Sequence, residues 1–409
     1  MRGRALVFIL LGLIAQGLHA ASAEDLARLY KTHEWFKLMH AVQGTEVPLF
    51  FRGTVECALD KTEPCIRAMT EVIKTAQGRQ DEHEAHSILA GFYLRKGEYA
   101  ESLAETERIL AVSPDDADAQ GNIAFLRAAA RFPDQRIVSA GTAHLSWTYP
   151  GKSLTIPLTI NGKRANYFID TGANVSTMSD ADAQRLGLEL QEASASVNGA
   201  SGASAPFRVA NAKQLRIGNF ELQNVVFLVS SANQPPFNDK PVLEQGIIGL
   251  PILLAAKHIR WNRSGFDIVA DTTAAAASPA PNLLMDEGYV IANATFQHDS
   301  LSFLLDSGSI WTFMYPRFAQ NHVSYVKAHG SMTSKQLQGF GGQIKVPAWH
   351  LPKLRVRIAE TVDDLNDVDV LLDHTDQNSY RYDGCLGLDT MLHRGMVDLN
   401  FEQMQIVIR

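Results

Sequence analysis

Two segments of the chain each end an apolar run with an aspartate, a hydroxyl residue and a glycine: Phe168–Ala173 and Leu304–Ser309. Their aspartates are Asp170 and Asp306. A carboxylate that ends a buried strand is costly unless it has partners, because burial disfavours its charge. Two carboxylates brought within reach of each other share one proton, which leaves one base and one acid side by side. The sequence therefore predicts a carboxylate pair that activates water, with no metal and no cofactor.

Each aspartate is followed at nearly the same distance by an apolar pair framed by glycines. Gly246–Gly249 follows the first aspartate, and Gly384–Gly387 follows the second at almost the same spacing. A match of this kind indicates one supersecondary unit used twice. We expect the two turns to meet at a pseudo-twofold axis, where glycine permits a close backbone approach and the hydroxyls bond across the interface. The residues expected to support the aspartates are Thr171, Gly172, Ser307, Gly308 and Ser309.

The two turns differ after the glycine, with Ala173 in the first and Ser309 in the second. A hydroxyl at this position could donate to Asp306 and stabilise its charged form. The sequence therefore predicts that Asp170 more often carries the shared proton.

These motifs resemble the retropepsin-like aspartic peptidases, here as a fused tandem over residues 138–409. The resemblance implies an all-β bilobal domain, catalytic roles for Asp170 and Asp306, and a supporting role for the glycine-framed pairs. It also implies a glycine-tipped hairpin over the substrate in each lobe, although such clusters equally fit flexible surface loops. The flap candidates are Asn198, Gly199, Ala200 and Ser201 in the first lobe, and Gly339, Phe340 and Gly341 in the second.

The β pattern supports this division. Short alternating runs fill residues 138–270, with Asn161–Gly162 as a hairpin signal, and the same order recurs over 283–409. Residues 271–282 are small, proline-bearing and nearly uncharged, which predicts an interdomain linker.

Residues 24–132 are helical in pattern, and one stretch resembles a tetratricopeptide repeat. Gly97 is expected at the turn between its helices and Pro114 at its end, while Ser102 stands where the pattern usually has alanine. The fold class is thus multidomain, an all-α tetratricopeptide-like segment followed by the β domain. These helices are expected either to recruit a protein partner or to pack on the neighbouring domain.

Positions 1–23 have the pattern of a signal peptide. Two arginines precede an apolar stretch, and Ala21-Ser22-Ala23 offers a cleavage site, with cleavage after Ala20 as an alternative. The apolar stretch is short for a membrane span, and no lipoprotein cysteine is present near the site. The expected location is the periplasm or the exterior, and an uncleaved anchor is the alternative.

The net charge of −7 and the lack of a basic tract argue against nucleic acid as a partner. Of the three cysteines, Cys57 and Cys65 are disulfide candidates in an exported segment, although two buried thiols also fit. Cys385 is expected to be a small buried apolar residue.

The sequence predicts an exported aspartic endopeptidase that acts on peptides or proteins. The alternative is a peptide-binding module of the same fold without catalysis, with the helices recruiting a partner. Both aspartates and both hydroxyl residues are intact, which favours catalysis.

Overall fold

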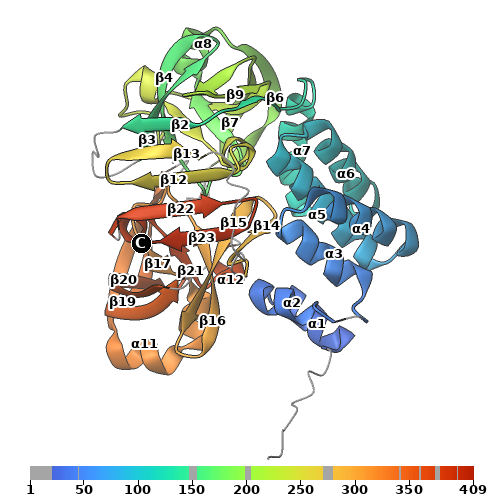
Figure 1. Cartoon of the computed structure of the whole chain (residues 1–409), viewed down its shortest axis with the longest axis vertical. Coiled ribbons are helices and arrows are strands. Elements are labelled where there is room, and N and C mark those ends of the chain that lie inside the picture. The colour runs from blue at the N-terminus through green and yellow to red at the C-terminus, as the bar shows by residue number, and fades with distance from the viewer. Residues whose placement is uncertain are drawn as a thin grey trace, which may run out of the picture.

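The chain has a helical region followed by a larger region rich in β-sheet. A computed structural model describes residues 21–44, 46–146, 154–198, 204–269, 280–339, 342–358, 361–373, 378–393 and 395–409. In Figure 1 the helices lie along one side of two β lobes that are stacked along the long axis. The predicted order of a helical segment before a bilobal β domain is confirmed.

The described part of the helical region contains seven α-helices. They are α1 (Ala23–Lys31), α2 (Trp35–Ala41), α3 (Leu49–Ala58), α4 (Thr62–Thr75), α5 (Gln80–Lys96), α6 (Tyr99–Val112) and α7 (Ala117–Ala129). Helix α5 ends where Gly97 adopts the left-handed conformation, as predicted for the turn. Ser102 on α6 donates to the carbonyl of Ala90 on α5 at 2.8 Å, so the small polar residue joins the two helices. The tetratricopeptide assignment itself stays a prediction.

The first lobe is built on a ten-stranded sheet of order β1-β9-β8-β3-β4-β11-β5-β10-β7-β6. Its strands are β1 (Arg136–Ala140), β3 (Thr155–Ile160), β4 (Lys163–Ile169), β5 (Ser176–Ser179), β6 (Glu189–Asn198), β7 (Ser204–Ala212), β8 (Leu215–Ile217), β9 (Phe220–Gln223), β10 (Val225–Ser230) and β11 (Gly246–Ile248). Its helices are α8 (Asp180–Leu186), the 3₁₀ helix η1 (Val242–Glu244) and α9 (Leu250–Ala255). The predicted Asn161–Gly162 turn joins β3 to β4, and both residues have positive φ, which this turn requires.

The second lobe has an eight-stranded sheet of order β14-β15-β16-β21-β17-β20-β19-β18. Its strands are β14 (Leu283–Asp286), β15 (Tyr289–Phe296), β16 (Asp299–Leu305), β17 (Phe313–Met314), β18 (Ser331–Gly339), β19 (Gly342–Ile358), β20 (Thr361–Leu371) and β21 (Gly384–Leu386). Its helices are α10 (Pro316–Asn321), α11 (Val323–His329), α12 (Asn378–Arg381) and α13 (Leu388–His393). From β15 to β18 the strand order matches that from β3 to β6 in the first lobe, so the predicted internal repeat is confirmed.

A third, five-stranded sheet joins the lobes in the order β2-β13-β12-β22-β23. Its strands are β2 (Ala143–Ser146), β12 (His258–Asn262), β13 (Gly265–Ile268), β22 (Met396–Asn400) and β23 (Gln405–Ile408). Strands β12 and β22 pair antiparallel, with Arg260 opposite Asp398. The two closing segments of the repeat therefore pair with each other. Residues 271–279 of the predicted linker lie outside the described residues.

The helical region shares hydrophobic cores with both lobes. Helices α1 to α5 form one buried cluster with second-lobe residues that include Leu284, Ile291 and Leu304. Helices α5 to α7 form another cluster with first-lobe residues that include Phe207 and Val209. The segment is thus part of the folded body of the protein, which agrees with the packing role expected for it.

A buried carboxylate anchors the helices to the second lobe. Asp286, at the end of β14, is only 4% exposed, and it accepts hydrogen bonds from the indole of Trp35 at 2.8 Å and the hydroxyl of Tyr382 at 3.0 Å. Burial raises the pKa of Asp286, but His33, whose Nδ1 lies 3.7 Å away, the charge of Arg381 and the hydrogen bond from Trp35 outweigh it and hold that pKa below its ordinary value. The charged form is therefore the one that the fold stabilises.

The structure also places a disulfide in the helical region. Cys57, near the end of α3, is bonded to Cys65, in the first turn of α4. The bridge closes the short connection between these helices, and Cys385 is a buried free thiol.

Replacing Asp286 with alanine is expected to lower the free energy of unfolding by about 3–5 kcal/mol, because a buried charged group is removed while its donors and cations remain. Urea unfolding followed by circular dichroism measures this change. Asp239→Ala, at an exposed aspartate, is the control and should stay within about 0.5 kcal/mol of the wild type. An unchanged urea transition for Asp286→Ala would contradict the anchoring role.

Candidate active site

Each aspartate stands at the end of a strand that pairs with a glycine-framed segment. Strand β11 runs parallel to β4, and the backbone N–H of Asp170 donates to the carbonyl of Ile248 at 3.0 Å. In the second lobe β21 runs parallel to β16, and the N–H of Asp306 donates to Leu386 at 3.1 Å. The segments thus support the two turns from behind, as the family resemblance implied.

The closing glycines of these segments are held in the same way in both lobes. Gly249 donates its N–H to the hydroxyl of Ser176, and Gly387 donates to Thr312, both at 3.0 Å. A Cβ on Gly387 would lie 2.5 Å from the backbone of Trp311, which is closer than real side chains approach. Glycine is needed here because two backbone segments cross in contact.

Four reciprocal hydrogen bonds join the two turns across the lobe interface. The Thr171 hydroxyl donates to the carbonyl of Leu305 at 2.8 Å and accepts from the Ser307 N–H at 3.0 Å. In the opposite sense, the Ser307 hydroxyl donates to Ile169 at 2.9 Å and accepts from the Thr171 N–H at 3.1 Å. Both hydroxyl residues are buried, so these bonds are shielded from water. The predicted interface role of Thr171 and Ser307 matches this geometry.

The glycines that follow admit the carboxyl group of the opposite lobe. A Cβ on Gly172 would lie 2.6 Å from the carboxyl carbon of Asp306, and a Cβ on Gly308 would lie 2.6 Å from that of Asp170. Each carboxyl thus occupies the space that a side chain would fill on the other turn. The structure therefore brings the predicted pair of carboxyl groups together.

The electrostatics of the pair are unequal. Burial, the neighbouring charge of Asp306 and the hydrogen bond between the carboxyls raise the pKa of Asp170 well above its ordinary range. Burial also raises the pKa of Asp306, but hydrogen bonds from Asp170, the N–H groups of Ser309 and Gly308, and the thiol of Cys385 oppose that rise. More backbone N–H groups donate to Asp306 than to Asp170, and this favours the charge on Asp306 and the predicted place of the shared proton on Asp170.

The sequence analysis predicted the wrong group of Ser309 as the donor to Asp306. The hydroxyl of Ser309 donates to the carbonyl of Trp311 at 2.9 Å, and it is the backbone N–H of Ser309 that donates to Asp306, at 3.0 Å. Sequence reasoning also missed Cys385, whose thiol lies 3.9 Å from Asp306 Oδ2. Its position in the second glycine-framed pair, where the first lobe has Ile247, was the available signal.

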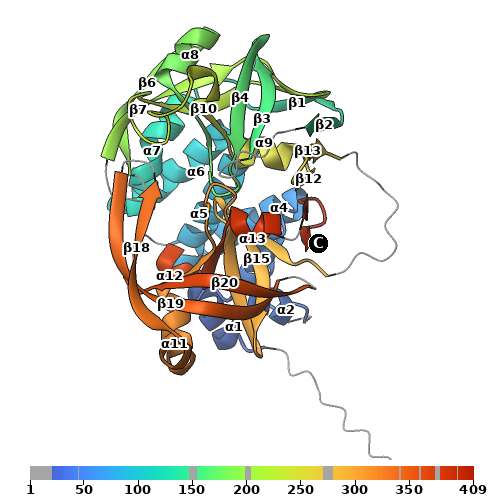
Figure 2. The ribbon, with the colours of Figure 1, turned by 90° about the vertical axis from the view of Figure 1, so that its left-hand side faces the viewer.

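Both flap candidates fall on hairpins. Strands β6 and β7 pair up to Asn198 opposite Ser204, and β18 and β19 pair up to Gly339 opposite Gly342. In Figure 2 the two hairpins extend toward each other from the two lobes. Their contact with a substrate stays a prediction, and several of the tip residues lie outside the described residues, namely Gly199, Ala200, Ser201, Phe340 and Gly341.

Residues 156–252, which run from β3 to α9 and include Asp170 and its supporting segment, match the family model described as aspartyl protease. The described β region consists of two lobes with matching strand order, and this family match lies within the first lobe. Among solved structures, a retropepsin-like aspartic protease from Rickettsia conorii is similar to the chain at 19% identity and a TM-score of 0.25. That match covers 33% of this chain and 92% of the other. No curated protein matches the chain.

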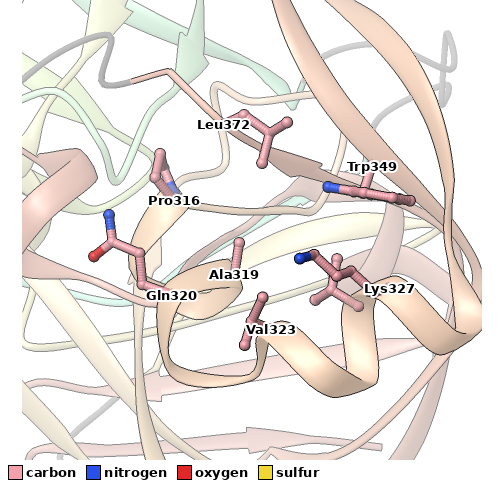
Figure 3. A pocket seen from close by; sticks show the side chains of 8 residues that line it. Pro316, Ala319, Gln320, Val323, Lys327, Trp349 and Leu372 are labelled. Carbon is pink, nitrogen blue, oxygen red and sulfur yellow. The ribbon is translucent and has the colours of Figure 1, made fainter.

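A cavity of about 250 Å³ lies in the second lobe. Helices α10 and α11 form one wall, and Trp349 and Leu372 form the other (Figure 3). Its lining is almost entirely apolar, apart from Gln320 and Lys327. None of the predicted site residues lines it.

Removal of the Cys385 thiol is expected to shift the pH dependence of the pair. In Cys385→Ala, Asp306 loses a donor that favours its charged form, so its pKa rises and the acidic limb of the activity profile moves to higher pH. Cys385→Ser keeps a donor at this position and should leave the limb close to that of the wild type. A profile of kcat/KM against pH for the three proteins measures the shift, and equal limbs for alanine and wild type would contradict the role of the thiol.

Proposed function

We propose that this chain is an exported aspartic endopeptidase that hydrolyses peptide bonds with a water activated between Asp170 and Asp306. The single observation that carries the proposal is the close carboxyl pair, in which each group lies over the glycine of the opposite turn. The aspartyl protease match of the first lobe supports the same chemistry.

The inequality of the pair suggests the role of each residue. Asp306, which holds the charge, takes a proton from water as the oxygen attacks the substrate carbonyl carbon. Asp170 gives its proton to the carbonyl oxygen, so the intermediate carries no net charge. The proton on Asp306 then passes to the leaving nitrogen as the C–N bond breaks, and Asp170 recovers its proton from the intermediate. The cycle consumes one water and returns the pair to its starting state.

The competing function is a module that binds peptides without cutting them. The intact pair and its complete set of supporting hydrogen bonds favour catalysis, because capture alone does not need a proton-sharing site. The helices that would recruit a partner in that alternative are largely engaged in the shared cores.

Conversion of either aspartate to asparagine is expected to lower kcat by about 10²–10⁴-fold, because the pair loses its base or its acid. The assay is cleavage of an unstructured protein by the full chain, with the products mapped by mass spectrometry. Asp239→Asn serves as the exposed control and should cut like the wild type. Equal cleavage by all variants would end the proposal, and peptide that is bound but uncut by the wild type would support the binding module.

Export is part of the proposal, and the capping of α1 favours one of the two cleavage sites. The Ser22 hydroxyl accepts from the N–H of Asp25 at 3.1 Å, while the Asp25 carboxylate accepts from Ser22, which completes a capping box. Ala21 also packs on the helical core. Cleavage after Ala20 keeps these contacts, whereas cleavage after Ala23 removes a cap worth about 1 kcal/mol. Within the described residues, no helix is long and apolar enough to span a membrane.

N-terminal sequencing of the protein exported from a bacterial host is therefore expected to begin at Ala21. A mature chain that begins at Glu24 would contradict the choice of site, and a chain that retains Met1 and stays in the cell fraction would contradict export.

A further inference from the structure

We infer that helices α5 to α7 close the approach to the carboxyl pair on the side of the first catalytic turn. A bound peptide then extends freely only past the second turn. This inference rests on the proposed peptidase function and adds to it the shape of substrate that the site accepts.

The two catalytic turns are equivalent in sequence position but unequal in exposure. Four and five residues after the aspartate, the first turn has Asn174 and Val175, and the second has Ile310 and Trp311. Ile310 is 36% exposed and Trp311 is 57% exposed, whereas both first-lobe residues are partly covered. The second turn therefore presents an indole to solvent at a position where the first turn is covered.

Two elements cover the first turn. Val175 packs against a buried cluster that contains Tyr99 and Phe125 of the helical segment. Asn174 lies under the β14–β15 connection, because a Cβ placed on Gly288 would be 2.8 Å from the Cβ of Asn174. That connection in turn touches α5, because a Cβ on Gly91 would be 3.4 Å from the backbone of Glu287. The first turn is therefore covered in layers, first by the β14–β15 connection and then by helices.

The strands beside each turn carry the same inequality in their side chains. Val209 and Leu228 pair across β7 and β10, and both are buried in the cluster shared with the helices. Strand register identifies the corresponding pair in the second lobe. Leu228 lies opposite Thr177, and Asp369 lies opposite Phe313; Thr177 and Phe313 each come seven residues after the aspartate of their lobe. Asp369 therefore corresponds to Leu228, and its partner His350 corresponds to Val209. An apolar pair in the first lobe thus corresponds to a hydrogen-bonded histidine and aspartate, 3.2 Å apart, in the second.

The polar side of the second lobe is joined to the exposed indole. Lys335 on β18 pairs with Asp369 at 2.8 Å, and its ammonium lies 5.6 Å from the centre of the Trp311 ring. The polar side chains of this surface suit contact with water or with a bound peptide. The corresponding surface of the first lobe is apolar and is covered by the helices.

The first hairpin is held at its base, in contrast to the outer strand of the second. Phe207 on β7 contacts Phe125 on α7, with ring centres 6.4 Å apart, and Arg131 donates to Gln191 on β6 at 3.0 Å. On β18, by comparison, Met332 is 60% exposed. The end of a bound peptide on the first-lobe side would therefore run against the helices. We expect cleavage to fall close to that end of the peptide.

A peptide series tests this inference. Starting from any sequence that the wild-type full chain cuts, streptavidin-bound biotin is placed at increasing distances from the cut bond, on its N-terminal side in one series and on its C-terminal side in the other. The expected result is a loss of kcat/KM of about tenfold or more for near tags in one series only. Equal losses in both series would overturn the inference. Failure to cut the untagged peptides would instead count against the proposed peptidase function.

A pair of matched variants assigns the closure to the helices. Phe125→Ala loosens the contact of α7 with the first hairpin, whereas Phe51→Ala removes an equally buried ring in α3, away from that contact. The quantity compared is the loss of kcat/KM that near tags cause in each series. Phe125→Ala is expected to reduce the difference in this loss between the two series by about tenfold, and Phe51→Ala is expected to preserve it. If both variants keep the wild-type difference while remaining folded by circular dichroism, the helices do not form the wall.

Discussion

The site depends on the contact of two backbone turns that are close enough for each carboxyl group to lie over the glycine of the other. This approach has no room for even one Cβ, and the four hydrogen bonds of Thr171 and Ser307 fix its geometry. The sharing of a proton follows from that distance, since two carboxylates in contact cannot both be ionised at moderate cost. The additional N–H donors around Asp306 favour its charged form over that of Asp170. Chemistry and architecture are therefore set by the same contact.

Three further layers keep the turns in register. The glycine-framed segments support each turn from behind, the shared five-stranded sheet joins the lobes, and the helices add hydrophobic cores on one side. These layers act on different surfaces, so they restrain different motions between the lobes. The Asp286 cluster shows how specific the third layer is, because its donors come from a helix and from a strand connection 251 and 96 residues away.

Much of the site could be predicted from the sequence because its signals are local. The two triplets, the glycine-framed pairs and the Asn161–Gly162 turn each occupy a few residues, and their matched spacing revealed the repeat. The hydrophobic cores shared by the helices and the lobes were not predictable. Phe207 and Val209 fit the alternating pattern of any half-buried strand, and this pattern does not indicate which element covers them. The full length of β19 was not predictable, because Pro347 and Pro352 within it are residues that normally interrupt a strand. The partner of the Ser309 hydroxyl depended on a choice between two nearby acceptors, which only coordinates decide.

The pairing of Val209 with Leu228 in one lobe and of His350 with Asp369 in the other has a consequence for how the protein can change. In a homodimer of identical halves, a substitution that suits a covered surface would appear on both subunits, and one of them would expose it. Fusion into one chain frees each half from its twin. The surface of one half can then become apolar and stay packed against the helices, while the matching surface of the other half stays polar and exposed. The symmetric pair of aspartates between the halves is not affected.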